Sequence, residues 1–114
     1  MNLLNLFRHP PQLRDLTPQD LDNFIHAQDP VVIDVRTPTE YQAGHLPKAV
    51  LAPLGTTLQH ITHVGHERPV VLICKTGHRS QAAAWELLAE GFTHVYHLKG
   101  GMDHWKKYEK SQQR

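Results

Sequence analysis

Apolar residues in this chain gather in short continuous runs, and stretches of helical spacing separate one run from the next. The runs 31–35 (VVIDV) and 70–73 (VVLI) are typical of strands that are covered on both faces. Shorter runs at 49–51 and 94–98 predict two further strands. Strands that alternate with helices favour an α/β fold with a central, mainly parallel sheet.

Helix start signals flank the first of these runs. Thr17, Pro18 and Asp20 supply an N-cap, a proline in the first turn and an acid near the positive end of the helix dipole. This helix is expected to end at 29–30 (Asp-Pro), because the residue before a proline avoids the helical region. The pattern 37–40 (TPTE) predicts a second, short helix that begins with a capping box.

Three more helices are predicted further along the chain. Apolar residues recur every three positions over 55–64 and indicate a helix there. The alanine-rich segment 81–90 has an apolar face of its own and predicts the next helix. A terminal helix around Trp105 should follow the glycine pair at 100–101.

The length of 114 residues fits one domain. We expect this domain over 14–109, preceded by a loose arm (1–13) and followed by a short tail (110–114). The arm lacks a basic start and makes a poor signal peptide, and a weak amphipathic anchor is the alternative interpretation of it.

Charge and cysteine content exclude several classes. Lys and Arg number 12 against 11 Asp and Glu, so no global positive field attracts nucleic acid. No stretch approaches the ~20 apolar residues of a membrane span, and no stable membrane insertion is expected. A single cysteine rules out an internal disulfide framework and suits a reducing compartment, here taken as the cytoplasm.

The single cysteine, Cys74, is the candidate nucleophile. It follows the apolar run 70–73 and precedes the helical segment 81–90, so the sulfur should lie at a helix N-terminus. Backbone N–H groups and the helix dipole favour negative charge there, and a thiol so placed ionises more readily than a free one. A small buried residue at a strand end is the alternative interpretation. The intervening loop consists of Lys75, Thr76, Gly77, His78, Arg79 and Ser80.

Three motifs together resemble the single-domain rhodanese family of sulfurtransferases, over about residues 14–107. They are IDVR (33–36) continued by EYQAGHLPKA (40–49), CKTGHRS (74–80), which fits C-x-x-G-x-R-S, and LKGG (98–101) followed by Trp105. The resemblance implies a five-stranded parallel sheet flanked by helices. It also implies that Cys74 carries a persulfide between two half-reactions.

The same resemblance implies a small-molecule sulfur donor such as thiosulfate and an acceptor that is cyanide or a thiol. A partner protein is a further candidate acceptor, and no cofactor is expected. The N–H groups of the loop can form an anion-binding nest, and Lys75, His78 and Arg79 add positive charge for an anionic donor. Arg79 has two interpretations, since its guanidinium can bind the donor or brace the loop.

Asp34 and Arg36 follow a neighbouring strand whose end should lie beside that of Cys74. They are expected to support the site, either by lining its mouth or, as favoured here, by bracing the loop through an Arg36–Glu40 pair or through Asp34. The 10 histidines suggest a metal, but those at 60, 63 and 66 and at 94 and 97 do not share one face. No metal site is expected, because no second thiolate or carboxylate completes a ligand set.

Three other functions compete with the sulfurtransferase interpretation. Cysteine phosphatases and arsenate reductases use a similar cradle, but phosphatases place five residues between cysteine and arginine, where this chain has four between Cys74 and Arg79. Non-catalytic members of the family often lack the cysteine, which this chain retains. A persulfide carrier that serves a partner protein is the third alternative.

Overall fold

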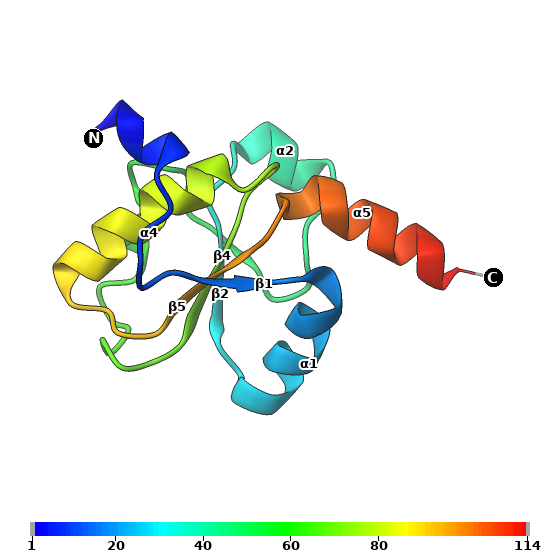
Figure 1. Cartoon of the computed structure of the whole chain (residues 1–114), viewed down its shortest axis with the longest axis horizontal. Helices are drawn as coiled ribbons and strands as arrows, with labels where there is room; N and C mark the ends of the chain where they lie inside the picture. Colours follow the sequence, from blue (N-terminus) through cyan, green and yellow to red (C-terminus); the bar gives the residue numbers. More distant parts are fainter. Residues whose placement is uncertain (1, 114) are drawn as a thin grey trace.

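The computed structural model describes residues 2–113 and shows a parallel five-stranded sheet between two layers of helices (Figure 1). The strand order is β1-β5-β4-β2-β3, and every neighbouring pair is parallel. The predicted fold is therefore confirmed. The strands are β1 (Arg14–Leu16), β2 (Val31–Asp34), β3 (Val50–Leu51), β4 (Val70–Ile73) and β5 (Val95–Leu98).

Six helices accompany the sheet in the described residues. The first two α-helices begin as their sequences predict, since Thr17 caps one and the Thr37–Glu40 capping box opens the next. The helices are the 3-10 helix η1 (Leu3–Phe7) and the α-helices α1 (Pro18–Gln28), α2 (Pro38–Gln42), α3 (Thr57–His60), α4 (His78–Glu90) and α5 (Gly101–Gln112).

Strand β4 divides its side chains between the two layers. Val70 and Leu72 pack into a buried cluster that includes alanines and Leu87 of α4. Val71 and Ile73 pack into a second buried cluster with residues of α1 and α5. The alternation follows from the two-residue period of a strand, and both layers of the core are apolar for that reason.

The segment 55–64 is less helical than predicted. Helix α3 covers only Thr57–His60, and Ile61 already departs from helical backbone angles. Several residues here are β-branched, which lowers helix propensity, and the side chain of Thr56 makes no capping hydrogen bond. Ile61 and Val64 are nevertheless buried. Their three-residue spacing therefore reflects burial in the turns that follow α3, and not a continuing helix.

Helix α4 begins earlier than predicted, at His78 in place of Gln81. Gly77 takes a left-handed conformation at the N-cap position, which lets the helix start three residues sooner. His78, Arg79 and Ser80 therefore form the first turn of α4.

The terminal segments are tied to the domain. Helix η1 lies along α4 (Figure 1), where Gln81 and Trp85 donate side-chain hydrogen bonds to the carbonyls of Leu6 and Arg8. Leu13 is buried in the core, within the segment 1–13 that the sequence suggests as a loose arm. Helix α5 continues to Gln112, beyond the boundary expected at 109. Among residues 2–113, no helix is long and apolar enough to cross a membrane.

Candidate active site

Cys74 lies at the carboxyl end of β4. Because the strands are parallel, the carboxyl ends of the central strands lie side by side at this edge of the sheet. Its side chain is fully buried, and Sγ accepts a hydrogen bond from the N–H of Gly77 at 2.9 Å. The hydroxyl oxygen of Ser80 lies 3.4 Å from the same sulfur. The sulfur is enclosed between the loop and the first turn of α4.

Gly77 directs its backbone N–H, a hydrogen-bond donor, at the sulfur of Cys74. Its φ of 103° lies in the left-handed region, which residues with a side chain rarely adopt. A Cβ built there would meet its nearest neighbour, the backbone nitrogen of Gly100, at an ordinary 3.5 Å. The glycine is therefore required by the backbone conformation that aims the N–H, and not by lack of space.

The N-terminus of α5 fixes the start of the loop. The N–H of Met102 donates to the carbonyl of Cys74 at 2.8 Å, and that of Asp103 donates to the carbonyl of Lys75 at 3.1 Å. Gly101 permits this approach, because a Cβ there would lie 2.4 Å from the carbonyl oxygen of Lys75. The LKGG motif thus lets the start of α5 approach and hydrogen-bond to the loop that carries Cys74.

Arg79 is braced by a carboxylate from another motif. Its two terminal nitrogens donate to the two oxygens of Glu40 at 2.7 and 2.8 Å. The hydrogen bonds from Arg79 lower the pKa of Glu40 to about 2, and the pKa of Arg79 is raised in turn by the same bonds. Of the two predicted roles for Arg79, this geometry is that of a brace. The sequence suggested Glu40 for the capping box and as a partner of Arg36, whereas the structure pairs Glu40 with Arg79.

Asp34 and Arg36 form a buried pair below the site. The guanidinium donates to both carboxylate oxygens at 2.9 and 2.8 Å and also to the carbonyl of Gly44 at 2.8 Å. Asp34 is fully buried, and Arg36 is 4% exposed. The two side chains tie the end of β2 to the turn after α2, which fits the favoured bracing interpretation and not a position at the mouth.

The remaining loop side chains point outward. The ammonium of Lys75 lies 3.0 Å from a carboxylate oxygen of Asp103, and both side chains are well exposed. Thr76 and His78 contact each other at 3.1 Å, and His78 also packs against Phe7 of η1. Lys75 and His78 are thus the exposed charged or titratable groups of the loop.

A hydrogen-bonded group behind the sulfur was not anticipated from the sequence. The oxygen of Ser80 lies 2.7 Å from Nδ1 of His97, and Nε2 of His97 lies 2.8 Å from Oδ1 of Asp15. His9 contacts the same oxygen at 2.7 Å. Asp15 and His97 are direct partners in the β1–β5 register. Only strand pairing brings them together, and no local motif indicates it.

The pKa values of this group favour a neutral imidazole beside a carboxylate. Burial lowers the pKa of His97, although the hydrogen bond to Asp15 acts in the opposite direction. Burial acts to raise the pKa of Asp15, but the hydrogen bonds from His9 and His97 outweigh it and the pKa is lowered. Asp15 is therefore ionised at neutral pH and accepts the hydrogen of Nε2.

The same three side chains offer a geometry that a metal ion could use. One ligand atom each from His9, Asp15 and His97 lies within 4.8 Å of the others. The two short hydrogen bonds onto Asp15 already account for this arrangement. Of the histidines considered from the sequence, His97 belongs to this cluster, whereas those at 60, 63, 66 and 94 do not.

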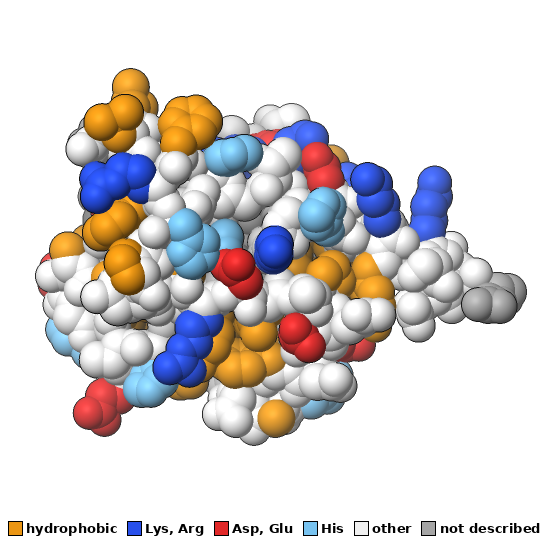
Figure 2. All heavy atoms as spheres, in the orientation of Figure 1, with side chains coloured by type: hydrophobic (Ala, Val, Ile, Leu, Met, Phe, Trp, Pro, Cys, Tyr) orange, Lys and Arg blue, Asp and Glu red, His pale blue; other side chains and the backbone are white. Residues whose placement is uncertain are grey.

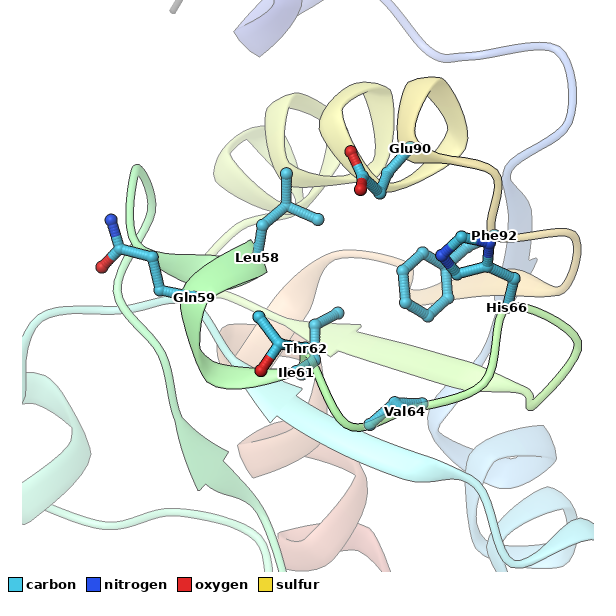
Figure 3. A pocket seen from close by; sticks show the side chains of 8 residues that line it. All are labelled: Leu58, Gln59, Ile61, Thr62, Val64, His66, Glu90 and Phe92. Carbon is cyan, nitrogen blue, oxygen red and sulfur yellow. The ribbon is translucent and has the colours of Figure 1, made fainter.

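Two hollows of the surface are compared as candidate sites. One, of about 450 Å³, lies beside the cysteine loop and is partly lined by Thr76, Gly77 and His97. Figure 2 shows histidine, basic and acidic side chains side by side near the middle of the face on which β1 lies in front. The second, of about 320 Å³, lies at the amino ends of the strands, where Glu90 ends α4 and His66 faces Phe92 (Figure 3). Cys74 is buried and lines neither hollow, but the wall of the first includes residues of the cysteine loop, so the first hollow is the candidate site.

Comparison with known proteins identifies the family of this chain. The family model of the rhodanese-like domain matches residues 17–108. The thiosulfate sulfurtransferase GlpE of Pseudomonas entomophila is 33% identical over 82 residues, which are 72% of this chain and 75% of that protein.

Solved structures share the fold. A rhodanese-like domain protein of Staphylococcus aureus superposes with a TM-score of 0.72 at 29% identity, covering 81% of this chain and 90% of that one. A Rhodopseudomonas palustris protein described as a possible tyrosine phosphatase gives a TM-score of 0.79 at 22% identity, covering 96% and 92% of the two chains. At that identity the second likeness shows the fold alone.

Proposed function

Because the chain belongs to the rhodanese-like domain family, we propose that it is a sulfurtransferase in which Cys74 carries a persulfide between two half-reactions. Relatives named thiosulfate sulfurtransferase support this reaction class. The observation that carries the proposal is the environment of the one thiol. Sγ of Cys74 lies at the carboxyl end of β4 with the N–H of Gly77 directed at it from 2.9 Å.

The proposed reaction is a double displacement at sulfur. The Cys74 thiolate attacks the outer sulfur of thiosulfate, a new S–S bond forms, and the S–S bond of the donor breaks to release sulfite. Cyanide or a thiolate then attacks the terminal sulfur, and the Cys74 thiolate leaves. This is covalent nucleophilic catalysis without a redox cofactor, since each step exchanges one bond to sulfur for another.

The surroundings of Cys74 suit such an intermediate. A persulfide bears negative charge at its terminal sulfur, and preorganised N–H groups at a helix N-terminus stabilise that charge. The N-terminal turn of α4 supplies this environment, and α5 holds the loop carbonyls away from the sulfur. Because Cys74 is fully buried, a donor must displace part of the loop to reach it.

Phosphatase or arsenate reductase activity fits the site less well. A phosphatase of this type uses its loop arginine to hold the phosphoryl oxygens, but both terminal nitrogens of Arg79 are engaged by Glu40. The loop also has one residue fewer than the phosphatase pattern, which makes a smaller cradle. We therefore favour sulfur transfer, with a small thiol, cyanide or a partner protein as the acceptor.

Mass spectrometry and a thiocyanate assay test the proposal. Incubation with thiosulfate should add one sulfur atom to Cys74, and cyanide should remove it as thiocyanate. Cys74→Ser should abolish both, because a serine hydroxyl is not ionised at neutral pH and forms no persulfide. Circular dichroism checks that this variant is folded. Thiocyanate formation that persists in the folded variant, or turnover of a phosphate ester in place of thiosulfate, would overturn the proposal.

A further inference from the structure

A continuous chain of hydrogen-bonding groups leads from the sulfur of Cys74 to the protein surface. It passes through the hydroxyl of Ser80 and the ring of His97 to the carboxylate of Asp15, at 3.4, 2.7 and 2.8 Å. Cys74 and Ser80 are fully buried, and His97 is 4% exposed. The side chain of Asp15 is 40% exposed and so brings the outer end of the chain to water.

The positions of the hydrogens follow from what each group can donate. Asp15 is an acceptor, so Nε2 of neutral His97 carries the hydrogen and Nδ1 has a free lone pair. The hydroxyl of Ser80 has one hydrogen, and its contact with Nδ1 at 2.7 Å is shorter than that with the carbonyl of Gly77 at 3.1 Å. The thiol of Cys74 then donates to the oxygen of Ser80. The hydrogens of Cys74 and Ser80 thus both point toward His97.

We propose that His97 takes up the proton of the Cys74 thiol through Ser80, while Asp15 holds the imidazole in place and stabilises its charged form. His97 is thereby a positioning residue, because it acts on Cys74 through Ser80 and so generates the thiolate nucleophile. This inference rests on the sulfur transfer proposed above. Nothing in the C-x-x-G-x-R-S motif requires this histidine or this aspartate.

The proton transfer is balanced without any other reactant. The S–H bond of Cys74 breaks as its proton moves to the oxygen of Ser80, and the original hydroxyl proton of Ser80 moves to Nδ1 of His97. The products are a thiolate, an intact serine hydroxyl and an imidazolium. The new hydroxyl hydrogen faces the sulfur, so the thiolate accepts from Ser80 as well as from the N–H of Gly77.

Charged groups around His97 act on its imidazolium in both directions. Burial disfavours it most, Asp15 on β1 favours it, and His9 on the N-terminal segment and Lys99 after β5 disfavour it. The further titratable groups that line the neighbouring hollow are His78, Asp103, His104 and Lys107. Asp15, which bonds directly to Nε2, is therefore the group that this mechanism requires.

Thiol alkylation against pH tests the relay without depending on sulfur transfer. The rate at which iodoacetamide modifies Cys74 is measured from pH 5 to pH 10 in the wild type and in His97→Gln. Glutamine can accept the hydrogen bond from Ser80 but cannot take a proton. We expect alkylation of the variant to be about tenfold slower near pH 7, and equal to the wild type at the alkaline end of the range, where hydroxide from solvent removes the proton without His97.

His94→Gln is the matched control. His94 is exposed and lies just before β5, at the edge of the sheet opposite to the one where Cys74 lies. It should alkylate as the wild type does throughout. A His97→Gln protein with an unchanged profile would overturn the relay, as would one that is slowed equally at every pH, because the second result indicates a purely structural role.

Two further variants examine the intermediate steps. Ser80→Ala interrupts the chain, and Ser80→Thr, which keeps the hydroxyl, should restore the wild-type profile. The double variant Ser80→Ala with His97→Gln should be no slower than Ser80→Ala alone, because residues of one relay do not add their effects. Additive losses would contradict the relay. Binding of one Zn²⁺ that is lost in His9→Ala, with no effect of His97→Gln on alkylation, would identify the cluster as a metal site instead.

If alkylation behaves as expected and thiosulfate is not consumed, the relay stands and the sulfurtransferase proposal fails. If thiocyanate forms but the alkylation profile of His97→Gln is unchanged, the opposite holds. The two assays therefore separate the thiolate-generating device from the reaction that it serves.

Discussion

Glu40 holds both terminal nitrogens of Arg79, although 39 positions separate the two residues in the sequence. The same carboxylate accepts from the backbone N–H of Thr37 at 3.0 Å and so completes the capping box of α2. One side chain thereby fixes the start of α2 and the first turn of α4. Through this contact, the β2–α2 connection helps to fix the position of the cysteine loop.

Arg79→Ala should lower kcat for thiosulfate and destabilise the fold by about 1–3 kcal/mol, because it leaves Glu40 without its partner. Arg79→Lys should recover little, since an ammonium cannot bond to both oxygens in the same way. Thermal melting and steady-state kinetics measure the two effects. Arg68→Ala is the control, because Arg68 is half exposed and lies 4.0 Å from the exposed Asp29, and it should change stability by less than about 0.5 kcal/mol.

The Glu40–Arg79 pair should make stability depend on acid pH. The pKa of Glu40 falls from its ordinary value of 4.5 to about 2 in the folded protein, so the folded state favours the ionised carboxylate. The stabilisation is complete above about pH 4.5 and is lost as the pH falls toward about 2. Urea unfolding of the wild type and of Glu40→Gln should therefore differ by about 1–3 kcal/mol at pH 6 and converge near pH 2. A difference that stays constant over this range would contradict the lowered pKa of Glu40.

Gly101→Ala should be strongly destabilising. Its Cβ would lie 2.4 Å from the carbonyl oxygen of Lys75 and 2.5 Å from that of Cys74, and its φ of 62° is already unfavourable for a side chain. Relief of this overlap must move backbone, so we expect a loss of more than about 2 kcal/mol and a lower kcat. Gly65→Ala is the matched control, because a Cβ there meets nothing within 4 Å. Equal melting temperatures for the two variants would refute the steric explanation of the glycine pair.

Asp103 should limit the use of Lys75 in donor capture. The two side chains pair at 3.0 Å while both remain exposed, so the carboxylate offsets the charge that attracts the thiosulfate dianion. Asp103→Asn should lower the KM for thiosulfate about twofold with little change in kcat, and Lys75→Ala should raise it. Both effects should shrink in 0.5 M salt, where exposed charges are screened within a few ångströms. Lys106→Ala, on an exposed part of α5, is the control. An unchanged KM in both variants at low salt would show that Lys75 takes no part in capture.

The local sequence determined the elements that need only their own residues. The proline and threonine at the start of α1 fix its first turn, and the apolar runs of β2 and β4 fix two buried strands, because capping and burial on both faces leave a signature within a few positions. The position of Cys74 after β4 follows in the same way. The likeness of the three motifs to the rhodanese family then supplied the number of strands, but the strand order came only from the structure.

The tertiary structure alone decided which distant side chains come together around the cysteine loop. Asp15 and His97 are 82 positions apart and meet because β1 pairs with β5 in one register. Arg79 contacts Glu40, which the sequence suggested for a cap and for a pair with Arg36, and Gly101 comes within contact distance of the loop carbonyls. These contacts depend on strand order and on the packing of distant elements. A pattern of hydrophobic and polar residues records whether a position is buried, but not which distant residue lies beside it.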